Sequence, residues 1–90
     1  MKRITIKTEI GVTVLETGMN EAIARLAAYE DVYAVLAENA VMIPLEMEKL
    51  KAAGKEKSVR YREMLGQKLM ETQFRALFQR HGITFDNTEG

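Results

Sequence analysis

Few side chains in this sequence are of the types that carry out catalysis or bind metals. His81 is the only histidine, cysteine is absent, and no nucleophile motif surrounds His81. The acidic clusters are Glu30-Asp31 and Glu46/Glu48, and neighbouring charges on helices usually face solvent. A metal site needs several converging ligands, and phosphate-loop and dinucleotide glycine patterns are missing. The sequence therefore predicts a protein that is not an enzyme, with no catalytic residue, no bound metal and no cofactor.

The basic side chains offer one candidate for binding, because they are concentrated in one stretch. Residues 1–48 hold four basic and eight acidic side chains, whereas residues 49–80 hold nine basic and three acidic ones. Two interpretations remain open: a solvated junction between helices, or a patch that faces nucleic-acid phosphates. For the second, the possible phosphate contacts are Lys55, Lys57, Arg60 and Arg62.

Tyr29 and Tyr33 are a second candidate for contacts with nucleic acid. They lie one helical turn apart and face the same way, so that they could stack a base. The alternative is that both rings cover the edge of a core and leave their hydroxyls in water.

The N-terminal residues have the pattern of a β-hairpin. Apolar and polar residues alternate from Arg3 to Ile10, and β-branched residues resume after Gly11. The alternation predicts two strands within about 3–15, with a turn near Glu9–Gly11. A two-stranded hairpin is marginal alone in water, so it must lie on the helices or pair with a second hairpin.

Three helices are expected after the hairpin, at about 21–38, 44–53 and 58–81. Asn20 is a good N-cap for the first, which ends near Asp31 or near Asn39. Pro44 suits the first turn of the second helix, and Gly54 can end it. For the third helix, Ser58 is the expected cap. At its end, Gly82 is expected in a Schellman motif that sets Ile83 against Phe78.

The last helix carries apolar residues on two sides. Tyr61, Leu65, Leu69 and Ala76 share one side, which can meet the first helix of the same chain. The other side needs cover of its own, and its residues are Val59, Met70, Phe74 and Leu77. The predicted fold is therefore α+β and mostly helical: an N-terminal β-hairpin followed by about three helices, the last long and heavily buried. Self-association through the second side predicts a homo-oligomer, with a dimer favoured.

Length and composition predict the number of domains, the absence of a membrane span and the cellular setting. The 90 residues predict a single domain, 1–90, with a frayed tail at 86–90. The longest apolar stretch, Ala40 to Leu45, is far too short to span a membrane, and the N-terminus lacks the apolar run of a signal peptide. Without cysteine there is no disulfide framework, so a cytoplasmic, reducing setting is expected.

One segment has a pattern known from other proteins. The sequence NEAIARLAAYED, Asn20 to Asp31, resembles short uncharacterised phage and prophage proteins of Gram-positive bacteria that carry an "RLAxYED" helix. In that family a glycine turn and a Pro-Glu-Glu helix follow, and Pro44 to Leu50 is similar to that second helix. Residues 32–43 depart from the pattern, being longer, apolar and without glycine. The resemblance implies a phage-encoded protein in the cytoplasm of a bacterial host, and it implies no activity.

Two functions follow from these patterns. The first is a non-enzymatic, self-associating protein of phage or prophage type with a structural or protein-interaction role. The alternative is a nucleic-acid-binding accessory protein that binds weakly and without sequence specificity through the basic stretch.

Overall fold

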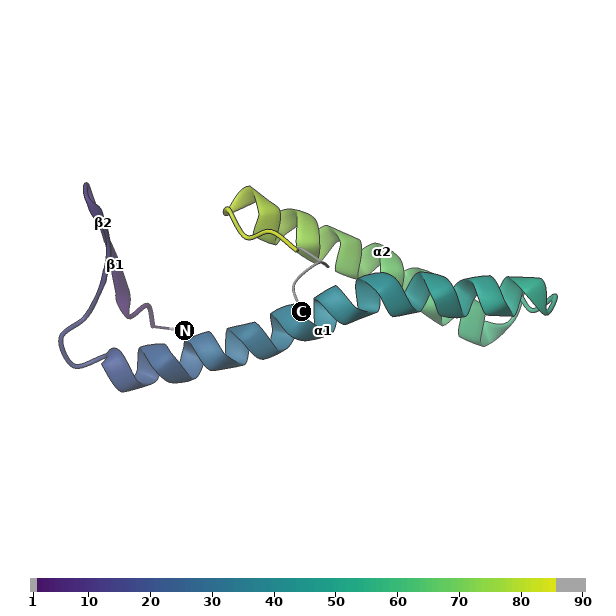
Figure 1. Cartoon of the computed structure of the whole chain (residues 1–90), viewed down its shortest axis with the longest axis horizontal. Helices are drawn as coiled ribbons and strands as arrows, with labels where there is room; N and C mark the ends of the chain where they lie inside the picture. Colours follow the sequence, from purple (N-terminus) through teal and green to yellow (C-terminus); the bar gives the residue numbers. More distant parts are fainter. Residues whose placement is uncertain (1, 86–90) are drawn as a thin grey trace. The chain divides into compact units, whose positions relative to one another are not determined.

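The computed structural model describes residues 2–85 as a β-hairpin followed by two helices (Figure 1). The elements in chain order are β1 (Thr5–Thr8), β2 (Gly11–Val14), α1 (Met19–Ala52) and α2 (Val59–Arg80). The chain divides into two compact units, Met1–Val32 and Tyr33–Gly90, which are described separately below. The predicted hairpin and mostly helical content are confirmed, but two helices stand where three were expected. The predicted frayed tail lies outside the described residues.

The hairpin follows the predicted pattern closely. β1 and β2 pair antiparallel, with Thr5 opposite Val14 and Thr8 opposite Gly11, so Glu9 and Ile10 form a two-residue turn. Gly11 has a φ of 151°, a conformation that side-chain-bearing residues rarely adopt. The glycine therefore permits the tight connection that the alternating sequence implied.

Helix α1 is continuous where two helices were predicted. Pro44 lies inside it, although a proline in a helix interior removes one hydrogen bond and costs about 3 kcal/mol. No glycine interrupts the chain between Gly18 and Gly54, and Ile43 and Met47, which flank Pro44, are both buried. Packing on both sides of the proline thus offsets its cost, and the helix ends neither at Asp31 nor at Asn39.

The helix ends are set by local signals, most of which the sequence had indicated. The hydroxyl of Ser58 accepts a hydrogen bond from the Tyr61 backbone N–H at 3.2 Å, which confirms it as the N-cap of α2. The Gly82 N–H donates to the Gln79 carbonyl and the Ile83 N–H donates to the Phe78 carbonyl, the two bonds of a Schellman motif.

The prediction for the start of α1 was wrong by a few residues. The helix begins at Met19, and the Gly18 carbonyl accepts from Ala22, so Asn20 lies in the first turn.

The turn between the helices is a second Schellman motif. Gly54 has a φ of 72°, its N–H donates to the Lys51 carbonyl, and the Lys55 N–H donates to the Leu50 carbonyl. The chain then reverses, and in the second unit α2 returns beside the latter part of α1 (Figure 1). Contacts between Asn39 and Glu71 and between Leu36 and Arg75 set the two helices antiparallel.

The core is thin in both units. In the first unit Ile4 and Gly18 are buried, and in the second Leu36, Ile43 and Met47 are. The expectation that the last helix is heavily buried was wrong, because Glu71 is its single buried residue. A layer of two helices can cover just one side of each, and most of α2 consequently faces solvent.

Candidate self-association surface

The apolar side of α2, defined by Val59, Met70, Phe74 and Leu77, is exposed along the helix. The steps from Met70 to Phe74 and from Phe74 to Leu77 are four and three residues, which places these side chains on one face. Their exposed fractions are 69% for Val59, 52% for Met70, 46% for Phe74 and 42% for Leu77. Residues 2–85 therefore leave the predicted surface uncovered.

The side of α2 that faces α1 has polar residues at its centre. Glu71 lies at its centre, 6% exposed, and its carboxylate accepts hydrogen bonds from the Asn39 amide at 3.0 and 3.3 Å. One turn further on, Arg75 donates to the Leu36 carbonyl at 3.4 Å and to the Thr72 hydroxyl at 3.2 Å. Tyr61, Met64 and Phe78 are half-buried on the same side of α2 as Glu71 and Arg75, so polar and apolar residues together face α1. The residues of the predicted self-association side, Val59, Met70, Phe74 and Leu77, are exposed instead.

This arrangement corrects the expected pairing of the helices. The side with Tyr61, Leu65, Leu69 and Ala76 was expected to meet the first helix. Tyr61 is half-buried, but Leu65 and Leu69 are 40% and 58% exposed. The helix is rotated so that the strip between its two apolar sides faces α1. That strip holds the buried Glu71, which accepts from the half-buried Asn39, and the half-buried Met64 and Phe78.

Helix α1 adds further apolar residues to the same surface. Val35 and Met42 lie one turn before and one turn after Asn39, and both are more than half exposed. In an antiparallel pair whose seam runs through Leu36 and Glu71, helical geometry places them on the same flank as Phe74. Sequence reasoning missed this contribution, because the antiparallel register that joins the two helices is not visible in either helix alone.

The four predicted phosphate contacts lie around the turn between the helices and at the start of α2. All four are exposed, and within residues 2–85 their side chains make no hydrogen bond or ion pair. Lys55 and Lys57 belong to the turn, whereas Arg60 and Arg62 belong to the first turns of α2. Two residues apart on a helix means about 200° of rotation, so Arg60 and Arg62 project to nearly opposite sides. The basic residues are thus close in sequence but do not form one flat face.

Tyr33 has a structural role that the sequence reading did not assign. Its hydroxyl donates to the Thr84 carbonyl at 2.6 Å, and its ring stacks on Phe85 with centroids 4.5 Å apart. Phe85 in turn stacks against Phe78 at 6.0 Å. The ring of Tyr33 is therefore engaged with the chain that follows α2, which argues against the interpretation that it stacks a base with Tyr29. His81 is the C-cap of α2, as its place before Gly82 implied.

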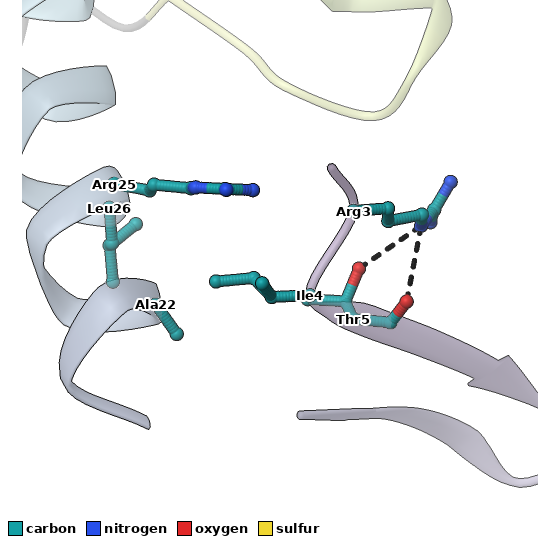
Figure 2. A pocket seen from close by; sticks show the side chains of 6 residues that line it. All are labelled: Arg3, Ile4, Thr5, Ala22, Arg25 and Leu26. Atoms are coloured by element: carbon teal, nitrogen blue, oxygen red, sulfur yellow. Dashed lines mark hydrogen bonds between the residues drawn. The ribbon is translucent and has the colours of Figure 1, made fainter. Parts of the chain in front are cut away.

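The first unit contains an open hollow of about 570 Å³ between the start of β1 and α1 (Figure 2). Figure 2 shows the side chain of Ile4 pointing toward Ala22 and Leu26, which form an apolar floor. The two guanidinium groups at the hollow have partners within the chain. Arg3 donates to Thr5, and Arg25 donates to the Lys2 carbonyl and to the Glu21 carboxylate. Of these contacts, the one from Arg25 to the Lys2 carbonyl connects α1 to the segment that precedes the hairpin.

Comparison of the chain with protein-family models, with curated proteins and with solved structures found no match in any of the three. Among residues 2–85 no group of three or more histidine or acidic side chains is placed to hold a metal ion. Within the same described range, neither helix is long and apolar enough to cross a membrane.

Proposed function

We propose that this protein is a non-enzymatic, self-associating protein with a structural or protein-interaction role, and that its basic unit is a homodimer. The single observation that carries the proposal is the exposed apolar side of α2 together with Val35 and Met42 of α1. Contiguous exposed apolar surface on a small protein usually marks a site of protein–protein contact. A second copy is the simplest partner, because a two-fold axis lets one surface cover another of the same kind.

The thin core supports the same proposal. Four apolar side chains are buried among the described residues, and none of them is fully buried. A domain of this size buries only about 60% of the surface of its unfolded chain and gains from a partner subunit. Met70, Phe74 and Leu77 are about half exposed, so covering each of them would stabilise the dimer by about 1 kcal/mol, roughly half the value for burying a fully exposed side chain.

A phage or prophage origin is part of the proposal. It is supported by the resemblance of residues 20–31 and 44–50 to the phage protein family described above. On this view the protein works in the cytoplasm of the bacterial host, and its role depends on what it assembles with rather than on a reaction.

The test is the mass in solution of the wild type and of two matched variants. Phe74→Asp places a charge on the proposed surface, whereas Leu69→Asp places one on an exposed position about 140° away on the same helix. We expect sedimentation at micromolar concentration to give a dimer for the wild type and for Leu69→Asp, and a monomer for Phe74→Asp. A monomeric wild type, or an unchanged mass for Phe74→Asp, would refute the proposal.

A second candidate is weak binding of nucleic acid through the basic residues of the turn. The observation in its favour is that Lys55, Lys57, Arg60 and Arg62 are exposed and lack partners among the described residues. Such binding would be indifferent to sequence and steeply dependent on salt, because counterion release would supply most of its free energy. An electrophoretic shift series at low salt tests it. No shift, or a shift that persists when all four residues are alanine, eliminates this candidate.

A further inference from the structure

The two edges of the hairpin differ in their chemistry, and the hydrogen-bond pattern shows which groups point outward. Leu15 donates to the Ile4 carbonyl at 2.9 Å, which makes these two residues a hydrogen-bonded pair of the ladder. Hydrogen-bonded pairs alternate along an antiparallel ladder, so Ile6 and Thr13 form the next one. The intervening pairs direct their backbone groups away from each other. The N–H and C=O groups of Val12 and Val14 therefore point outward from β2, and those of Thr5 and Lys7 point outward from β1.

The outer edge of β1 is protected against pairing with another strand. The Nε of Arg3 donates to the outward carbonyl of Thr5 at 3.3 Å and to its hydroxyl at 3.2 Å (Figure 2). Lys7 adds a charged side chain on the same strand, and lysine is a common device against edge-to-edge pairing. Two copies of this edge brought together would also place the positive charges of Arg3 and Lys7 close to those of the second copy.

The outer edge of β2 lacks this protection. Residues 10–15 contain no charged side chain, and Val12 is 65% exposed. Within residues 2–85, β2 pairs with β1 alone, and no hydrogen bond is made by the outward groups of Val12 or Val14. A neutral edge rich in β-branched residues with unpaired N–H and C=O groups is a template for another strand.

We propose that the outer edge of β2 pairs antiparallel with the same edge of a second copy, so that two hairpins form a four-stranded sheet. In the register that uses both outward residues, Val12 lies opposite Val14 of the second copy, and Thr13 lies opposite Thr13 of the second copy. The strand is self-complementary in this register, because valine meets valine, threonine meets threonine and no like charges face each other. A four-stranded sheet is also more stable than an isolated two-stranded hairpin, which is marginal in water.

This inference rests on the self-association proposed above, but it uses a different surface from the apolar side of α2. The two surfaces can therefore be tested independently. Because the chain has no cysteine, a single introduced thiol reports which residues meet across the axis. Thr13 would form a non-hydrogen-bonded pair with its symmetry mate, with Cα atoms about 4.5 Å apart, a separation that a disulfide can bridge.

The experiment compares Thr13→Cys with Ile6→Cys, which lies directly opposite on β1 and would be remote from its symmetry mate. Under mild oxidation we expect Thr13→Cys to form a covalent dimer and Ile6→Cys to remain monomeric on a non-reducing gel. The cross-linking is repeated with Phe74→Asp present. A Thr13→Cys dimer that persists there shows that the β2 edge associates on its own. Equal yields from Thr13→Cys and Ile6→Cys in both backgrounds overturn the β2 pairing. Because β2 pairing could itself keep Phe74→Asp dimeric, the α2 surface is decided with the β2 edge blocked by Val12→Pro: an equal mass for Val12→Pro with and without Phe74→Asp overturns the α2 surface.

A second pair of variants distinguishes a specific loss of pairing at the β2 edge from a general disruption of the hairpin. Val12→Pro removes one outward N–H from β2 and leaves the bonds between β1 and β2 intact, and Lys7→Pro does the same on the protected edge directly opposite. Each two-fold pairing would lose two hydrogen bonds in Val12→Pro, so we expect its Thr13→Cys cross-linking to fall by about tenfold. We expect no fall in Lys7→Pro. A similar fall in both variants would overturn the proposal.

Discussion

The hydrogen bond from the half-buried Asn39 to the buried Glu71 allows a prediction with a definite sign. Glu71 is 6% exposed, and within residues 2–85 its carboxylate has one donor, the Asn39 amide. Arg75, one turn away, uses its guanidinium on the Leu36 carbonyl and the Thr72 hydroxyl. The carboxylate has therefore been removed from water with a neutral partner and without an ion pair.

The magnitudes follow from the cost of burying polar groups. Asn39→Ala leaves the carboxylate without a donor, and a hydrogen bond to a charged group contributes about 1.5–3 kcal/mol, so we expect a loss of about 2 kcal/mol. Replacing both Asn39 and Glu71 by leucine removes the desolvation of the charge and adds apolar contact across the seam. Replacing both partners of a buried hydrogen bond by apolar residues can be nearly neutral or stabilising, so we expect the double variant to be at least as stable as the wild type.

The assay is urea unfolding followed by far-ultraviolet circular dichroism, with both single variants included to complete a double-mutant cycle. The wild type, Asn39→Ala, the two single leucine variants and the double-leucine variant are all measured at one concentration, because self-association would make apparent stability depend on concentration. An Asn39→Ala variant as stable as the wild type would refute the reasoning. So would a double-leucine variant that is less stable than the wild type.

Three further predictions concern the backbone of the helices, and each is checked by urea unfolding at the same protein concentration. Pro44→Ala restores a hydrogen bond inside α1 and should raise stability by up to about 3 kcal/mol; a loss would mean that the proline is required by the packing around it. Gly54→Ala should lower stability by about 1–2 kcal/mol, because φ is 72° there. Gly66→Ala, inside α2, should raise stability by about 1 kcal/mol, because a Cβ added there meets no atom within 4 Å apart from the backbone of its own helix. Ser58→Ala removes the acceptor for the Tyr61 N–H and should lower stability by about 1 kcal/mol, so an unchanged midpoint would contradict its assignment as the cap.

Features set by neighbours in the sequence could be predicted well. The Schellman motif at Gly82 and the cap at Ser58 depend on residues within five positions of each other, and both are present. The hairpin turn beside Gly11 was predictable for the same reason. Pro44 was misjudged because a proline is a strong local signal, whereas the burial of Ile43 and Met47 that offsets it comes from tertiary packing.

The residues that α2 contributes to the candidate surface could be predicted from the sequence, but the residues that α1 contributes could not. The helical spacing of Met70, Phe74 and Leu77 identified an apolar side, and that side is exposed. Which side of α2 meets α1 depends on Asn39 and Glu71, which are 32 residues apart, and no periodicity within one helix contains that information. The contribution of Val35 and Met42 depends on the same pairing and was missed with it.

The contacts between α1 and α2 also imply an order of folding. Asn39 meets Glu71 across 32 residues, Arg75 meets Leu36 across 39, and Tyr33 meets Thr84 across 51. Each contact encloses the one before it, so the entropy lost in closing each loop is small once the inner contact exists. The contacts between the two helices should therefore form in order, starting beside the turn at Gly54. The hydrogen bond from Tyr33 to Thr84 should form last. It should also open first, and in native-state hydrogen exchange the amides at the end of α2 should lose protection before those beside the turn.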